Sequence, residues 1–259
     1  GLACLEAVLR KGGVRLVAVS AVQFRCGLRM PLRDMAALTH AHGAELCVDG
    51  VQACGVVPLD VVADEVDYLA CGGHKWLTGL EGTGFLYVRP SCAAALRNVV
   101  AGWLSHEDPV GFLLEGVPGR LRYDRPLRSG VDALEPGGVS SVGFAALGAA
   151  IAPLRALGVA QIFEHVSRYL DVLEAGLVAR GFESLRSPRV EQRSAILAVR
   201  PPRGHAVLDL HRGLLAQGVA TATPDGVLRL SPHWPNSLDE VSEVLDAVDE
   251  VLRAPNGGS

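Results

Sequence analysis

The chain has 259 residues, of which 49% are hydrophobic and 20% charged, and its formal net charge is −4. This composition predicts a globular protein with a sizeable core and is too apolar for a disordered chain. The mild acidity and the lack of a Lys/Arg run argue against a nucleic-acid partner, and no apolar stretch reaches the roughly 18–20 residues of a membrane span.

The first half of the chain alternates expected helices and strands. Apolar side chains recur at helical spacing over residues 2–9, and again after Pro31 in a stretch that Gly43 ends. Short apolar runs that suit strands buried on both faces of a parallel sheet occur at residues 14–20, 45–49, 66–71 and 85–88. This alternation of strand and helix predicts an α/β fold.

The second half begins with a change of composition. From Trp103 to Gly138 the periodicity fades and Gly, Pro and Arg become frequent, which is typical of a long functional loop and domain connection. Helical patterns then cover residues 142–156, 158–180, 205–218 and 237–252. Strand patterns cover residues 194–200, 219–223 and 227–231.

These patterns predict two domains. We expect a three-layer αβα large domain with a mostly parallel sheet in residues 1–142, and a smaller α+β domain in residues 143–259. The chain starts without Met, inside or at the edge of a helix that feeds a sheet. We therefore expect the sheet of the large domain to be incomplete at its N-terminal side.

The six cysteines all fall in the first 92 residues, and none forms a C-x-x-C pair. Most lie within apolar runs, which favours small buried core residues in a reducing cytoplasm. A metal site or a disulfide framework is not expected.

Two expected neighbouring strands end in residues with reactive side chains. Asp49 ends the run ELCVD, and Lys75 follows Gly72 and Gly73 after the run VDYLAC. Because ligands of open α/β sheets bind at the carboxyl ends of the strands, the acid and the lysine should reach the binding edge. Burial would lower the pKa of this lysine, and a neutral amine is what Schiff-base chemistry requires.

Several interpretations of this pair are open from the residues alone. Lys75 could extend from the strand end into solvent, or it could form a structural ion pair with Asp49. Alternatively, both could serve one pyridoxal ring, with the lysine bonded to its aldehyde and the acid paired with its protonated nitrogen.

Five segments together carry a resemblance to a known family. They are VDGVQACGVVPLDV, VDYLACGGHKWLTGLEGTGFLYV, GWLSHEDP, LEPGGVS and LRLSPHWPNS. In this order they resemble the class V aminotransferase family of pyridoxal-phosphate enzymes, which have the fold type I also seen in cysteine desulfurases. The resemblance covers nearly the whole chain. It implies pyridoxal 5′-phosphate as the cofactor, a small-molecule amino-acid substrate and a homodimer.

The resemblance also implies roles for individual residues. Lys75 would form the internal aldimine, a Schiff base, and act as the base for the substrate α-proton. Asp49 would pair with the ring nitrogen, and the other implied cofactor contacts are Val51 on the ring face, Gln52 on the ring hydroxyl, His74 on the phosphate, and Gln23 near the ring. Arg229 would bind the substrate carboxylate, a role that suits a planar bidentate donor.

Simpler roles stay open for three of these residues. Gln52 could be an exposed residue at a helix start, His74 a hydrogen-bonded structural histidine, and Arg229 a surface strand residue.

The chain also departs from the family pattern. Gly72 stands where many members have a hydroxyl residue that binds the phosphate, and Phe24 stands where many have an asparagine near the ring hydroxyl. Gly138 replaces a small hydroxyl residue that reaches the phosphate across a dimer interface. Family members carry well over a hundred residues before the point that matches Gly1.

The resemblance implies an amino-acid aminotransferase that uses Lys75. A C–S lyase or an epimerase of the same family, or a non-catalytic relative that kept the fold, are the alternatives. The range from Ser187 to Arg229 contains no cysteine, which counts against the thiol chemistry of a desulfurase.

Overall fold

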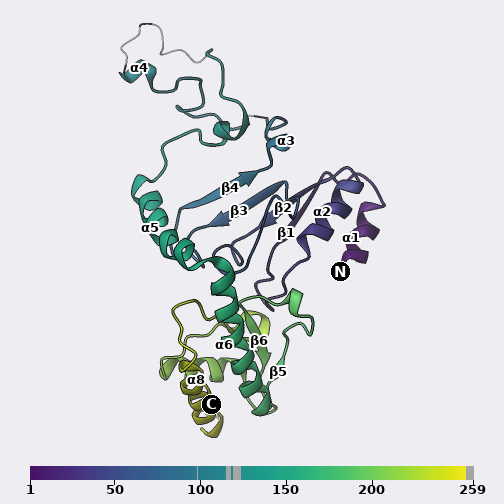
Figure 1. The fold of residues 1–259 in the computed structure, drawn as a ribbon, viewed down its shortest axis with the longest axis vertical. Helices are drawn as coiled ribbons and strands as arrows, with labels where there is room; N and C mark the ends of the chain where they lie inside the picture. The colour runs from purple at the N-terminus through teal and green to yellow at the C-terminus, as the bar shows by residue number, and fades with distance from the viewer. Residues whose placement is uncertain (98, 115–117, 119–123, 255–259) are drawn as a thin grey trace.

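The computed structural model describes residues 1–97, 99–114, 118 and 124–254 (Figure 1). In this part of the chain the strands form two sheets, ordered β1-β2-β3-β4 and β5-β6-β7. The strands are β1 (Leu16–Ser20), β2 (Glu45–Asp49), β3 (Tyr68–Gly72), β4 (Gly84–Val88), β5 (Glu183–Ser184), β6 (Leu197–Arg200) and β7 (Leu228–Leu230). The helices are α1 (Leu2–Leu9), α2 (Leu32–Ala41), α3 (Pro90–Ala93), α4 (Gly111–Leu114), α5 (Ser141–Leu157), α6 (Val159–Ala179), α7 (Val207–Ala216) and α8 (Glu240–Arg253).

The first sheet is mostly parallel, which confirms the α/β fold class. Strands β1, β2 and β3 run parallel, and their register places Asp49 between Ser20 and Ala70. Hydrophobic side chains with full burial, such as Leu46 and Val48, alternate along β2. The tips of β1, β2 and β3 therefore lie at one edge of the sheet, where a ligand can reach them.

Strand β4 differs from the expectation of a parallel strand buried on both faces. It runs antiparallel to β3, and Phe85 and Leu86 on it are exposed. The connection from β3 to β4 is a compact turn in which the amide of Gly73 donates to the carbonyl of Thr83. A parallel strand needs a crossover of a dozen or more residues, usually helical, so this turn returns the chain beside β3 in the opposite direction.

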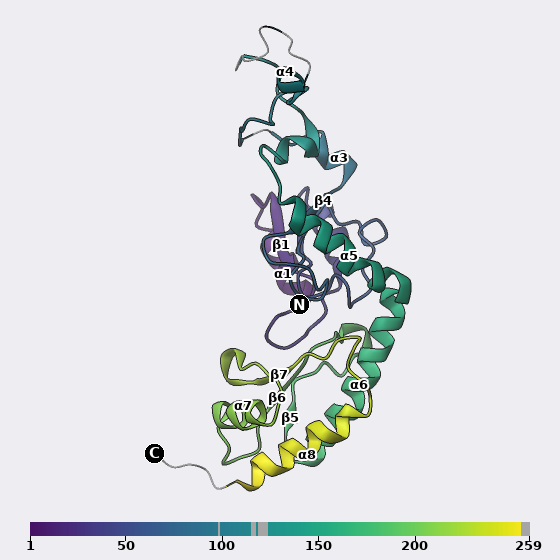
Figure 2. The ribbon, with the colours of Figure 1, turned by 90° about the vertical axis from the view of Figure 1, so that its left-hand side faces the viewer.

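The second sheet is antiparallel and packs with the long C-terminal helices (Figures 1 and 2). Helix α6 buries a stripe with helical spacing, and α8 lies beside it. The members of this stripe are Ile162, Val166, Tyr169, Leu170, Leu173 and Leu177. Together with Leu197 and Leu228 of the sheet, they form the core of this half of the molecule.

Helices α5 and α6 meet at Gly158 and are bent by 77° relative to each other. Gly158 has a φ of 83°, which an L-residue adopts only with strain. No single helix among the described residues is long and apolar enough to cross a membrane, although this bent pair meets that test by length and composition.

The division at residues 142 and 143 stays a prediction. Leu147 of α5 packs against the turn that follows β3, where a Cβ added at Gly73 or Gly79 would meet it at 2.7 Å. The first turns of the expected small domain therefore contact the first sheet. Parts of the expected loop from Trp103 to Gly138, residues 115–117 and 119–123, lie outside the described residues.

The two sheets are joined by a polar contact near the tip of β1. The hydroxyl of Ser194, just before β6, donates to the carbonyl of Gly27 at 2.6 Å, and the amide of Arg29 donates to the carbonyl of Gln192. At Gly27 an added Cβ would lie 2.5 Å from the carbonyl oxygen of Ile196. Only glycine allows this close approach, so the turn after β1 is held directly against the second sheet.

Candidate functional site

Asp49 lies at the exposed tip of β2, with its carboxylate fixed from two sides. The hydroxyl of Ser20 donates to Oδ2 at 3.0 Å, and the amide of Val51 donates to Oδ1 at 2.9 Å. The carboxylate is open to solvent and is satisfied by neutral donors, so it does not need a cationic partner. Each oxygen keeps a further lone pair for a ligand.

Lys75 lies two residues beyond Gly73 in the turn after β3, and its side chain is exposed. The expectation of a buried lysine is therefore wrong, because the turn carries the residue past the edge of the sheet. Among the described residues no carboxylate lies within ion-pair distance of Lys75, so the expected alternative of an ion pair with Asp49 is also not observed. The Lys75 Nζ lies 5.9 Å from the centroid of the Phe24 ring.

Gln52 and Trp76 connect the turn after β2 with the residue after Lys75. Gln52 is 7% exposed, so it is not an exposed residue at a helix start. The indole Nε1 of Trp76 donates to Gln52 Oε1 at 3.3 Å. The carbonyl of Trp76 in turn accepts a hydrogen bond from His233 Nε2 at 2.8 Å, and the two rings meet edge to face. This chain of contacts ties the lysine-bearing turn to the C-terminal half.

The side chains of His74 and Val51 both lie close to Gly72. A Cβ added at Gly72 would approach two atoms of the His74 imidazole at 3.0 Å and would lie 4.0 Å from Val51 Cγ2. The glycine that replaces the family's hydroxyl residue therefore makes room for the His74 ring. The imidazole itself is exposed and is free to meet a ligand.

Arg229 on β7 reaches across to the turn after β1. Its guanidinium carbon lies 4.5 Å from the centroid of the Phe24 ring, and its NH1 donates to the carbonyl of Phe24 at 3.0 Å. Its Nε is buried without a partner, and burial lowers the pKa of the guanidinium. Arg229 therefore lies at the same site as Lys75, against the simpler view that it is a surface strand residue.

Gln23 and Phe24 belong to a short turn after β1. The amide of Gln23 donates to the carbonyl of Leu28, and the amide of Gly27 donates to the carbonyl of Gln23. The Gln23 side chain is half-buried, whereas Phe24 is 50% exposed. Sequence reasoning treated Phe24 only as a departure from a family pattern, and it gave no signal that this ring would lie between a lysine and an arginine.

Most of the cysteines were expected to be buried core residues, and this expectation is wrong. Cys71 and Cys92 are buried, but Cys4 is exposed and the other cysteines are half-buried. Cys54 and Cys71 lie next to each other, just behind the loops that carry Asp49 and Lys75. The neighbouring Cys71 thiol lowers the pKa of Cys54, whereas the Cys54 thiol and burial raise that of Cys71. Among the described residues, no cluster of three or more His, Cys, Asp or Glu side chains is arranged to bind a metal.

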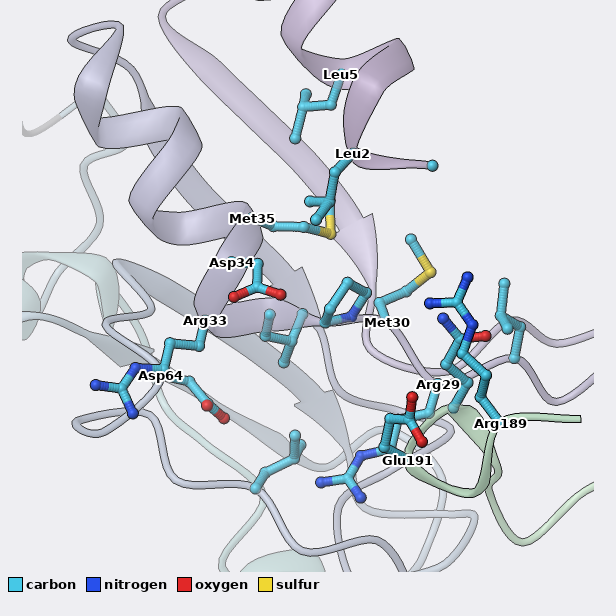
Figure 3. Close-up of a pocket in the computed structure, with 16 residues that line it drawn as sticks. Leu2, Leu5, Arg29, Met30, Arg33, Asp34, Met35, Asp64, Arg189 and Glu191 are labelled. Carbon is cyan, nitrogen blue, oxygen red and sulfur yellow. The ribbon is translucent and has the colours of Figure 1, made fainter. Parts of the chain in front are cut away.

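Figure 3 shows a cavity of about 560 Å³ that lies away from these residues. Its lining comes from α1, from the start of α2 and from the segment before β6. The lining combines charged side chains of both signs, among them Arg33, Asp34, Arg189 and Glu191, with apolar ones such as Leu2. None of the predicted site residues lines it, so the candidate site is the open strand edge and not this cavity.

A comparison with family models matches residues 2–228 to the model described as aminotransferase class V. Among curated proteins, an uncharacterised aminotransferase of Bacillus subtilis is 28% identical over 90% of this chain and 58% of its own length. Isopenicillin N epimerase of Streptomyces clavuligerus is 29% identical over 91% of this chain and 60% of its own length. The chain thus spans less than two thirds of the length of these relatives.

Solved structures show the same fold. The apo cysteine desulfurase of Thermococcus onnurineus superposes with a TM-score of 0.85 at 22% identity, over 98% of this chain and 63% of the desulfurase. A mutant of the cystine C–S lyase C-DES, with glycine covalently linked to its pyridoxal-phosphate cofactor, superposes with a TM-score of 0.80 at 22% identity, over 94% of this chain and 63% of the lyase.

Proposed function

Because the chain belongs to the class V aminotransferase family, we propose that it binds pyridoxal 5′-phosphate through Lys75 and acts on an amino acid, most simply as an aminotransferase. Pyridoxal 5′-phosphate is the cofactor of this family, and the family match extends over most of the chain. The observation that carries the proposal is the unpaired Lys75 at one sheet edge with the fixed carboxylate of Asp49.

The residues present fit the cofactor. The Asp49 carboxylate offers oriented lone pairs to a protonated ring nitrogen, and Lys75 offers an amine without a competing acid. Val51 and His74 gather around Gly72, where the ring face and the phosphate would be contacted. Gln52, held by the indole of Trp76, would bind the ring hydroxyl, and Gln23 lies on the neighbouring turn.

The residues would divide the chemistry as follows. The bound cofactor would supply an electron sink for the bond that breaks at the substrate α-carbon. Lys75 would hold the cofactor and then, once released by the substrate amine, would move the α-proton as a general base. Arg229 would orient the substrate by its carboxylate through its guanidinium N–H groups.

Two related activities compete with transamination. C–S bond cleavage is supported by the likeness to C-DES, and epimerisation by the likeness to isopenicillin N epimerase. A desulfurase is less favoured, because the segment from Ser187 to Arg229, which leads to the carboxylate-binding residue, has no cysteine.

We also propose a cytoplasmic homodimer, which the family resemblance and the free thiols support.

The experiment that separates these activities is a screen of amino acids with the protein loaded with pyridoxal 5′-phosphate. Formation of a keto acid that requires an added keto-acid acceptor is expected for an aminotransferase. Pyruvate with sulfide from cysteine, or with cysteine persulfide from cystine, would indicate a C–S lyase instead, and loss of optical activity alone would indicate an epimerase. A Lys75→Ala variant is the control and should lose every one of these products. Turnover that survives in this variant would contradict the proposal.

A further inference from the structure

The ring of Phe24 lies within cation–π distance of two cations that come from distant parts of the chain. The guanidinium of Arg229 is 4.5 Å from its centroid and the Lys75 Nζ is 5.9 Å from it. Both distances are within the roughly 6 Å at which a ring face attracts a cation. The two cations are therefore no further apart than the sum of these two distances, and one ring contacts both of them.

The contact with Arg229 has two parts that act on different atoms. The ring covers the guanidinium, while the backbone carbonyl of the same residue accepts from NH1 at 3.0 Å. Together they fix the plane and the direction of the guanidinium without using an acidic side chain. Since the carbonyl belongs to the backbone, a substitution at position 24 removes the ring and leaves this hydrogen bond in place.

The charge of Arg229 is left uncompensated by this arrangement. No carboxylate among the described residues pairs with it, and its Nε is buried without a partner. A guanidinium that has lost water but has no anion favours an anionic ligand. An acidic residue in place of Phe24 would occupy the guanidinium itself, whereas an aromatic ring holds it and leaves its charge for the ligand.

The turn that carries Phe24 is fixed independently of the ring. Backbone hydrogen bonds between Gln23, Gly27 and Leu28 close it, and Ser194 holds it at Gly27. Phe24 is half exposed, so it contributes little to the core. A half-exposed aromatic ring that touches both reactive cations, on a turn that does not need it for folding, is placed to serve the ligand.

We propose that Phe24 is a positioning residue that holds Arg229 ready for a substrate carboxylate beside Lys75. The inference rests on the proposed function for the identity of the substrate, but the carboxylate-binding step can be measured without it. In this chain the aromatic ring would thus orient Arg229, the residue that binds the substrate carboxylate. The asparagine that many family members have at this position has no ring and could not attract a cation in this way.

The test uses propionate as a carboxylate probe and propylamine as a probe without a carboxylate, each titrated by NMR into the protein with and without pyridoxal 5′-phosphate. Phe24→Leu keeps an apolar side chain but removes the ring electrons, and it should weaken propionate binding about three- to tenfold. Phe24→Tyr keeps the ring and should bind within about twofold of the unaltered protein. Arg229→Ala should abolish propionate binding.

The alternative is that Phe24 only fills space. In that case Phe24→Leu would bind propionate as the unaltered protein does, or Phe24→Tyr would be impaired as much as Phe24→Leu; either result overturns the proposal. The proposal would also be overturned if the unaltered protein failed to bind propionate. Thermal melts of each variant show whether the fold is intact.

With an active amino donor, Phe24→Leu should raise KM and leave kcat nearly unchanged. The absence of a borohydride-stable adduct at Lys75 would defeat the proposed function alone, because propionate binding needs no cofactor.

Discussion

Ser20 donates a hydrogen bond to the carboxylate of Asp49 across the tips of β1 and β2, at 3.0 Å. The two residues are Cα partners in the parallel register, so the strand pairing itself brings the hydroxyl to the acid. The amide of Val51 fixes the other oxygen. The orientation of this acid is therefore set by the sheet and the turn before any ligand arrives.

Replacing Ser20 by Ala should weaken binding of pyridoxal 5′-phosphate, because one of the two donors that orient Asp49 is lost. A single hydrogen bond contributes about 1 kcal/mol, so the dissociation constant should rise roughly three- to tenfold. Absorbance titration with the cofactor measures it. Ser242→Ala, on the exposed side of α8, is the matched control and should bind normally. Equal affinities of the two variants would show that Ser20 does not orient the acid.

Gly27→Ala should be far more harmful than Gly43→Ala. Both glycines have a positive φ, +70° and +71°, so both substitutions carry the same backbone strain of about 1–2 kcal/mol. A Cβ at position 43 meets nothing within 4 Å, whereas one at position 27 would lie 2.5 Å from the Ile196 carbonyl oxygen. We expect Gly27→Ala to lower the free energy of unfolding by at least about 2 kcal/mol more than Gly43→Ala. Urea unfolding measures both, and similar losses would contradict the close approach.

His233 should make the protein less stable in mild acid. Burial lowers the pKa of its imidazole, although the hydrogen bond to the Trp76 carbonyl opposes this. Below the unfolded-state pKa of about 6.5, the unfolded chain takes up a proton at this residue and the folded protein does not, until the pH reaches the lower folded-state value. As the pH is lowered through that window, the free energy of unfolding should therefore fall. Above the window, this residue should have no effect on it.

The measurement compares urea midpoints at pH 7.5 and 5.5. His233→Gln keeps a donor near the Trp76 carbonyl but cannot titrate, so the midpoint should fall less on acidification than in the unaltered protein. His42→Gln, at an exposed position after α2, is the control for a histidine-to-glutamine change elsewhere in the chain. If all three proteins lose stability in parallel, His233 does not contribute to it.

Cys54 should be more reactive than its half-buried position suggests. The neighbouring Cys71 thiol lowers the pKa of Cys54, so more thiolate is present near neutral pH. Cys71→Ala removes this polar neighbour, so it should raise the pKa of Cys54 and slow its alkylation by iodoacetamide at pH 7.5. Cys71→Ser keeps a donor and should preserve the rate. Mass spectrometry of the Cys54 peptide follows the reaction, and equal rates in both variants would refute the contact.

The sequence predicted that the ends of β2 and β3 lie at one edge of the sheet, because this follows from local pattern, whereas the expected burial of Lys75 was wrong. Short apolar runs define β2 and β3, and a parallel sheet brings the ends of neighbouring strands to one edge. The direction of β4 was mispredicted, since an apolar run has no sign of direction and only the short turn after Gly73 decides it. Residues 219–223 were expected to form a strand, but only the bridge from Ala222 to Arg229 is formed.

Contacts between distant segments could not be predicted in the same way. Arg229 and Phe24 are 205 residues apart, and their pairing depends on how the second sheet sits against the turn after β1. Likewise, Asp67 lies inside what looks like an apolar run. It is 3% exposed and accepts hydrogen bonds from the amide of Leu46 and from His40. Hydrophobic periodicity predicts which positions are buried, but it does not predict which hydrogen-bond partner a buried polar side chain has.

The central claim is that Lys75 carries the cofactor, and the chain offers an internal control for it. Lys11 is the other lysine in these 259 residues, and it is exposed. The decisive measurement is to incubate the protein with pyridoxal 5′-phosphate, reduce it with borohydride and locate the added mass by peptide mass spectrometry. We predict stoichiometric modification of Lys75, little at Lys11, and loss of the visible absorbance in Lys75→Ala. No modification of Lys75, or equal modification of both lysines, would contradict the account.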